Sequence, residues 1–145
     1  MSAFLLDVNV LIALLDPTHT HHDHAHEWFA GPGRESWISC PTTQNGVVRI
    51  VSHPKYSNAQ PVPIVLESLD SLTRIGEHHF VPDAVSLLGD GVVRRNLLSS
   101  SQVTDTYLVQ LSVSLGARLA TFDTRLVTSA VSHAEGAVFH IPRSR

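Results

Sequence analysis

Hydrophobic residues in this chain form short unbroken runs that alternate with longer stretches of helical spacing. The first run, residues 3–6, has no polar gap and ends at the carboxylate of Asp7. Such a run is typical of a central strand in a parallel sheet, because a strand covered on both faces needs no polar side. Further strands are expected at residues 37–40, 79–81, 118–122 and 138–141.

The intervening stretches predict helices. The clearest covers residues 103–115, where apolar side chains recur on one helix face and Gly116 supplies the stop. A helix also follows Asp7 and closes before Pro17, and another is capped by Thr42 or Thr43. Other helices are expected over residues 22–29 and 64–75 and from Pro82-Asp83 to Leu88, with loops at 52–63 and 99–101. This alternation predicts a three-layer α/β/α domain with a mainly parallel central sheet.

Composition narrows the class of protein. The 145 residues, 43% of them hydrophobic, fit one domain spanning 1–145 with a single core. No apolar stretch approaches the ~20 residues that a membrane helix needs, and the first residues lack the basic start and cleavage site of a signal peptide. Cys40 is the one cysteine, so no internal disulfide can form and a reducing cytoplasm is expected.

The net charge of −3 argues against a protein that holds nucleic acid by a basic surface alone. Lys55 is the only lysine, and the other cations are arginines. A nucleic-acid enzyme of this composition needs a local device that tolerates phosphates, and a bound divalent metal ion is such a device.

Two of the expected strands end in the same way, at Asp7 and at Asp123. In a parallel sheet both carboxylates emerge at one edge, where open α/β sheets bind their ligands. Asp105 lies in the first turn of helix 103–115, which is expected to begin at the same edge. Three carboxylates this close repel one another unless a cation holds them, and a site of oxygen ligands alone selects Mg²⁺ or Mn²⁺. For Asp7 taken alone, a helix N-cap is an equally good interpretation.

Several segments together resemble the PIN-domain ribonucleases, specifically toxins of the VapC type. They are LLDVNVLIAL, the histidine and aromatic pattern of residues 22–29, CPTTQNGVVRIVS, FVPDAVSLL and QVTDTYLVQLSVSLGARLATFD, and they cover nearly the whole chain. The resemblance implies a PIN-like fold and a metal-dependent endoribonuclease that a cognate antitoxin neutralises. It also implies an RNA substrate, such as tRNA or rRNA, and a homodimer.

The resemblance assigns roles residue by residue: the metal-site acids match Asp7, Asp105 and Asp123, the catalytic polar positions beside them match Asn9 and Thr121, and the arginine after the second motif matches Arg49. The second motif departs from the family. Related toxins of this type read TEN where this chain has Thr43-Gln44-Asn45, and others carry Glu at the position of Gly46. Gln44 can still offer a metal its carbonyl oxygen, directly or through water, but no charge. Metal affinity, more than the fold, is therefore expected to differ.

Other interpretations fit parts of the sequence. His22 and His26 have the spacing of a zinc-binding helix, but no third ligand is evident. Arg94 and Arg95 fit either a phosphate contact or a solvated surface pair. A phosphatase of the haloacid-dehalogenase type would need a second acid where Asn9 stands. The strongest alternative is a PIN-fold binding module in which the missing second-motif acid has silenced catalysis.

Overall fold

A single parallel sheet forms the middle layer of the protein, whose structure is a computed structural model that describes residues 3–143. Its five strands lie in the order β3-β2-β1-β4-β5, and every neighbouring pair is parallel. The strands are β1 (Phe4–Leu6), β2 (Trp37–Ser39), β3 (His78–Phe80), β4 (Arg118–Thr121) and β5 (Val138–His140). All five predicted strands are thus confirmed, with ends within one residue or two of those expected.

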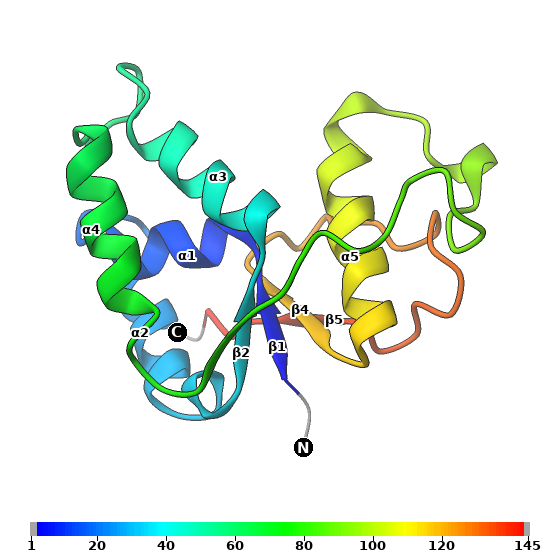
Figure 1. Ribbon diagram of the computed structural model, residues 1–145, viewed down its shortest axis with the longest axis horizontal. Coiled ribbons are helices and arrows are strands. Elements are labelled where there is room, and N and C mark those ends of the chain that lie inside the picture. The colour runs from blue at the N-terminus through cyan, green and yellow to red at the C-terminus, as the bar shows by residue number, and fades with distance from the viewer. Residues whose placement is uncertain (1–2, 144–145) are drawn as a thin grey trace.

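Helices cover both faces of the sheet, which confirms the predicted three layers (Figure 1). One face carries α1 (Val8–Leu15), α2 (His22–Ala30), α3 (Pro41–Val51) and α4 (Val62–Leu72), and the other carries α5 (Val103–Leu115). Short 3₁₀ turns occur at η1 (Gly33–Glu35), η2 (Arg94–Asn96) and η3 (Ser100–Gln102). Over residues 3–143, no helix combines the length and the apolar character that crossing a membrane requires.

The packing of the central strand β1 explains why all its residues are apolar. Phe4 and Leu6 pack into the hydrophobic cluster beneath α1 to α4, whereas Leu5 packs into the cluster beneath α5. Because successive side chains of a strand point to opposite faces, a strand between two helical layers must be apolar at every position. The run therefore ends where the strand leaves the core, at Asp7.

The predicted helix from Pro82-Asp83 to Leu88 is wrong, because this segment is irregular and runs alongside α5. The Gln110 side chain of α5 donates a hydrogen bond to the backbone carbonyl of Ser86 at 3.0 Å. Asp83, at the expected start of this helix, instead accepts a hydrogen bond from the Thr42 hydroxyl at 2.8 Å. The segment thus forms hydrogen bonds with α3 and α5 in place of those within a short helix. Gly89, a poor helix former, lies just beyond the expected end of that helix.

Gly46 lets α3 approach α1 closely. A β-carbon at this position would lie 2.9 Å from a methyl group of Val8, the residue that follows Asp7. The glycine costs helix α3 about 1 kcal/mol relative to alanine, and the close packing gives the physical reason for it. It sets the first turns of α3 directly beside the carboxyl end of β1.

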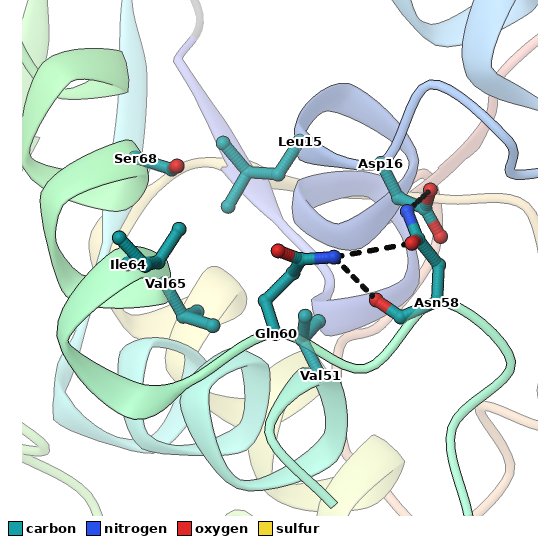
Figure 2. A pocket seen from close by; sticks show the side chains of 8 residues that line it. All are labelled: Leu15, Asp16, Val51, Asn58, Gln60, Ile64, Val65 and Ser68. Atoms are coloured by element: carbon teal, nitrogen blue, oxygen red, sulfur yellow. Dashed lines mark hydrogen bonds between the residues drawn. The ribbon is translucent and has the colours of Figure 1, made fainter.

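A buried carboxylate joins the end of α1 to the turn between α3 and α4. Asp16 is 4% exposed and accepts hydrogen bonds from the Tyr56 hydroxyl, from Asn58 Nδ2 at 2.8 Å and from Thr18 Oγ1 at 2.8 Å. Burial opposes ionisation of Asp16, but these hydrogen bonds outweigh it and lower its pKa to about 2. Figure 2 shows Asn58 reaching Asp16 at the edge of a small cavity, where Gln60 in turn donates to Asn58. The turn after α3 is therefore fixed to α1.

We expect Tyr56→Phe to lower the free energy of unfolding by about 1–3 kcal/mol at neutral pH, because the buried carboxylate loses one donor. The folded state holds the pKa of Asp16 at about 2, below the ordinary 3.8. This stabilisation is therefore complete above pH ~4 and fades as the pH falls towards 2. Urea titrations at several pH values measure it.

Tyr107→Phe is the matched control, because the Tyr107 hydroxyl is buried without a hydrogen-bond partner among residues 3–143. Equal losses of stability in the two variants would contradict the assigned role of Tyr56.

Candidate metal and RNA site

One hydroxyl group joins the carboxyl ends of β1 and β4. Thr121 Oγ1 donates to Asp7 Oδ2 at 2.7 Å and accepts from Asn9 Nδ2 at 3.1 Å and from the backbone N–H of Asp123 at 3.0 Å. Thr121 is fully buried, so these bonds are shielded from water. The structure thus brings four of the predicted site residues together around a single oxygen atom.

Asp7 caps helix α1 with one carboxylate oxygen and bonds Thr121 with the other. Its Oδ1 accepts the backbone N–H of Val8 at 2.7 Å at the start of α1, which confirms the predicted helix cap and leaves Oδ2 to Thr121. The side chain is 5% exposed. Burial raises the pKa of Asp7, the bonds from Thr121 and Val8 partly oppose the rise, and the charge of Asp123 adds to it. Keeping this carboxylate ionised thus calls for positive charge nearby.

Asp105 supplies the third carboxylate, from the first turn of α5 as predicted. Its pKa is raised to about 6, first by burial and then by the charges of Asp7 and Asp123. A helix N-terminus alone would favour the ionised form, so the other two effects dominate here. Asp7 and Asp123 are thus close enough to Asp105 for their charges to raise its pKa.

A cleft of about 570 Å³ opens over two of these acids. Its walls come from α1, α3 and the start of α5, and its lining includes Asp7, Asn9, Thr42, Asn45, Gly46, Arg49, Thr104 and Asp105. Asp123 is not part of this lining and reaches the site through its charge on the other two acids. The cleft therefore has an acidic floor and one guanidinium on its α3 wall.

The α3 wall shows which second-motif residues face the cleft. Thr42, Asn45, Gly46 and Arg49 line it, at i, i+3, i+4 and i+7 spacing on one helix face. Gln44 lies off this face, and its Nε2 donates instead to Ser39 Oγ at 3.0 Å. The sequence analysis did not single out Asn45, although counting back one turn from Arg49 would have found it.

Arg95, one of the predicted substrate contacts, lies apart from the cleft: it is exposed on η2 and does not line it.

The histidine pair that suggested a zinc site also lies apart from the cleft. His22 Nδ1 bonds the carbonyl of Ala13 at 2.7 Å and His26 Nε2 bonds that of Leu14 at 2.8 Å. Both rings thus satisfy free carbonyls at the end of α1, which is a structural role.

The donor set suits a hard cation in its chemistry. Within the described residues, no three His, Cys, Asp or Glu side chains are close enough, as placed, to hold a metal ion together. The Asp105 carboxylate accepts no hydrogen bond within this part of the chain. Carboxylate, amide and hydroxyl oxygens are what Mg²⁺ and Mn²⁺ prefer. The charge of such an ion would favour the ionised acids, whose pKa values are raised first by burial and then by their neighbours' charges.

In the metal-free protein we expect Asp105 to titrate near pH 6, and Asp123→Asn to lower this pKa because one repelling charge is gone. The raised pKa means that ionised Asp105 destabilises the folded state. This effect is complete above about pH 6 and fades as the pH falls from about 6 towards 3.8. Asp105→Asn should therefore raise the melting temperature more near neutral pH than at about pH 5. Carboxyl NMR titration and thermal melts measure both effects, and a pKa near 3.8 would contradict them.

Comparison with known proteins places the chain in a family. No protein-family model matches the chain. Ribonuclease VapC44 of Mycobacterium tuberculosis is 42% identical over 128 residues, which span 88% of this chain and 90% of that protein. Ribonuclease VapC39 of the same organism is 40% identical over 87% of this chain and 92% of its own length. For Ribonuclease VapC29 the identity is 37% over 134 residues, 92% of each chain.

Such identity extends across nearly the full length of both chains. The chain belongs to the family of VapC-type PIN-domain ribonucleases.

Proposed function

We propose that the protein is a divalent-metal-dependent endoribonuclease that acts as the toxin of a toxin–antitoxin pair. The observation that carries the proposal is the gathering of Asp7, Asp105 and Asp123 at one edge of the sheet. Burial raises the pKa values of Asp7 and Asp105, and the charges of the neighbouring acids add to the rise. The printed names of the relatives, which are ribonucleases, support RNA as the substrate.

The chain's own residues hold the acids and leave room for a strand of RNA. Thr121 and Asn9 fix the Asp7 carboxylate, and Asp105 stands at the opposite side of the cleft floor. Bound Mg²⁺ or Mn²⁺ would activate a water molecule and neutralise charge on the phosphodiester. Arg49 lines the same cleft from α3. Its guanidinium can contact a phosphate oxygen of an RNA strand that lies in the cleft.

Partners follow from this function. An acidic cleft with one arginine attracts a guanidinium as well as a metal, so a small antitoxin that inserts an arginine would block it. We further propose a homodimer that acts on RNA in the cytoplasm. Co-expression with the neighbouring small reading frame tests the antitoxin, because a true pair elutes as one complex.

A second candidate is a PIN-fold binding module with weakened catalysis. The observation that favours it is the α3 wall, where Thr42, Asn45, Gly46 and Arg49 bring no carboxylate into the cleft. Such a module would bind RNA or an antitoxin without cutting RNA. Incubating the purified protein with total RNA, with and without Mn²⁺, and mapping the new RNA ends separates the two functions.

We expect Asp105→Asn and Asp123→Asn each to slow RNA cleavage by at least ~100-fold. Loss of a residue that merely supports a ligand already costs about 10–100-fold, so loss of a charged ligand should cost no less. Cleavage rates at saturating Mn²⁺ measure the effect, and metal-free melting temperatures check that both variants fold.

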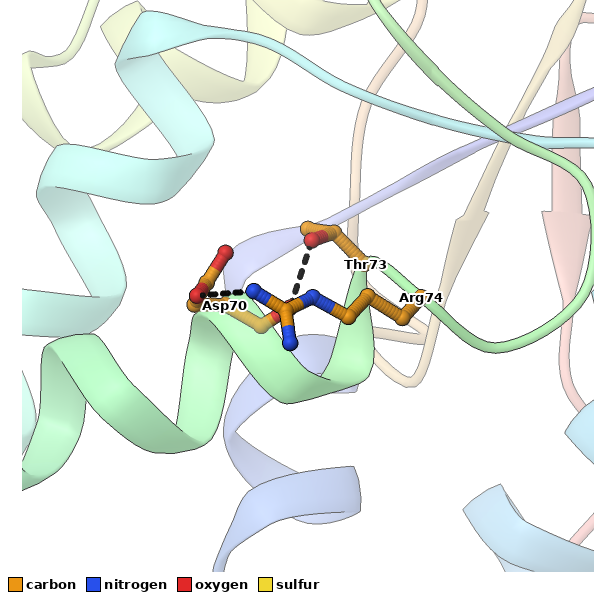
Figure 3. Close-up of polar contacts among 3 residues, drawn as sticks. All are labelled: Asp70, Thr73 and Arg74. Carbon is orange, nitrogen blue, oxygen red and sulfur yellow. Dashed lines mark hydrogen bonds and ion pairs between the residues drawn. The ribbon is translucent and has the colours of Figure 1, made fainter.

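Asp70→Asn is the control of equal charge. Asp70 pairs with Arg74 at 3.0 Å on the exposed end of α4 (Figure 3), away from the cleft. If it slowed cleavage as much as the site variants, the effect would come from overall charge and not from the proposed site.

The α3 wall leads to a prediction about metal affinity. Asn45→Asp adds a carboxylate to the cleft lining and should lower the Mn²⁺ concentration for half-maximal cleavage by roughly 10-fold. Gln44→Glu, tied to Ser39, should leave the metal titration unchanged. Gly46→Glu cannot serve here, since its β-carbon would collide with Val8. A lower metal requirement for Gln44→Glu alone would instead assign the ligand position to residue 44.

A further inference from the structure

A second hollow lies beside the cleft, at the end of α3. It has a volume of about 240 Å³ and is lined by Arg49, Ile50, His53, Lys55 and Tyr56. Two of these residues, Arg49 and Ile50, also line the cleft above the acids, so the two depressions are continuous. Figure 1 shows α3 running from the carboxyl end of the sheet to the turn at the upper left, on the side of the molecule away from α5.

The hollow is lined by cationic and donor groups that no carboxylate among residues 3–143 neutralises. Among residues 3–143 the Arg74–Asp70 pair is the one salt bridge, so Arg49 and Lys55 have no acidic partner there. Lys55 is the only lysine of a chain whose net charge is −3. Its placement next to the acidic cleft is therefore a specific local feature and not part of a general basic surface.

The histidine in this hollow is oriented as a donor. His53 Nδ1 lies 3.0 Å from the backbone N–H of Lys55 and accepts its hydrogen bond. In the neutral ring the proton then resides on Nε2, which remains available to a ligand. The carbonyls at the end of α3 carry partial negative charge, but those of Val48, Ile50 and Val51 accept N–H groups from the turn that follows.

The turn that carries these groups is held in place. Tyr56 donates its hydroxyl to the buried Asp16, and its backbone N–H bonds the carbonyl of His53 at 2.9 Å. Holding donors in place before binding reduces the entropy lost when a ligand arrives. A hollow with a fixed turn and unpaired cations suits an oxyanion.

We propose that this hollow binds a phosphate of the RNA strand that flanks the phosphate being cut, with Lys55 and His53 as its contacts and Arg49 between the two positions. This inference rests on the proposed ribonuclease function. With this second contact, the path of the RNA strand across the protein runs from the acids along α3 to the turn at residues 53–56. The acids repel phosphates, and the unpaired cations of this hollow compensate for that repulsion further along the strand.

Binding to RNA in EDTA tests the proposal without cleavage. The probe is a short fluorescent single-stranded RNA of random sequence, titrated with the wild-type protein and with Lys55→Gln over a range of salt concentrations. We expect Lys55→Gln to weaken binding by about 3–10-fold, as for a partly exposed charge-assisted hydrogen bond. The slope of log K against log salt should fall by about 0.7, the value for one phosphate contact on a single strand.

Two variants act as controls. Lys55→Arg keeps the charge and should bind RNA as the wild type does. Arg74→Gln removes one charge near the amino-terminal edge of the sheet, four residues before β3 begins, and should leave the slope unchanged. Lys55 is exposed, and its backbone N–H keeps its bond to His53 in all variants, so the fold is retained. An equal loss in Lys55→Gln and Arg74→Gln would overturn the proposal, because it would show only a long-range effect of charge.

Cleavage with Mn²⁺ supplies an independent measurement. On long RNA, Lys55→Gln should raise KM with kcat unchanged, because the contact stabilises substrate and transition state alike. A dinucleotide has a single phosphodiester and cannot fill the second position, so its cleavage should not respond to the substitution. Equal losses on both substrates would contradict the second phosphate site, whereas absence of cleavage by the wild type would count against the ribonuclease function alone.

An acidic protein segment is the competing ligand for the same cations. Poly-glutamate binding, measured at the same salt concentration, distinguishes the two. Tight binding of poly-glutamate that depends on Lys55, with RNA binding independent of it, would assign the hollow to a protein partner.

Discussion

The hydrogen bond from Thr121 to Asp7 is the constraint on which the site depends. It joins the ends of β1 and β4, two neighbouring strands whose sequences are more than 100 residues apart. Burying a carboxylate without hydrogen-bond donors costs free energy. Thr121 donates to Asp7, and it also accepts hydrogen bonds from Asn9 and from the backbone N–H of Asp123, so that it holds both residues beside Asp7. The site is thus built by satisfying one buried acid. The remaining repulsion among the carboxylates is left for a cation to relieve.

Much of the fold could be predicted from the sequence, because its central strands are covered on both faces. An apolar run that ends at an acid marks both a strand and the edge where it emerges, and β1 and β4 each end in this way. The position of Asp105 was equally accessible, since helix 103–115 has a clear periodicity and a glycine stop. Local pattern was sufficient for these elements because no distant contact competes with it.

The errors and omissions arose where distant contacts decide the structure. The segment after Pro82 has the composition of a short helix, but Gln110 and Thr42 bond its polar groups in an irregular path. The second motif posed a related problem: alignment with a family pattern singled out Gln44, whereas the helix face set by Gly46 and Arg49 turns Asn45 into the cleft. Which residue of α3 faces the acids depends on the angle at which α3 packs on α1. That angle follows from the contact between Gly46 and Val8, which one sequence alone does not reveal.

The length of helix α1 sets the distance between two parts of the protein. Asp7 caps its start and Asp16 its end, and the eight residues between them span about 12 Å at the usual rise of a helix. The first acid sets the floor of the cleft, and the second fixes the turn that carries Lys55. Inserting or deleting one residue in α1 would rotate one acid by about 100° relative to the other and break one of the two attachments. The two attachments therefore fix the length of α1, and the burial of its residues 10–14 keeps its sequence apolar.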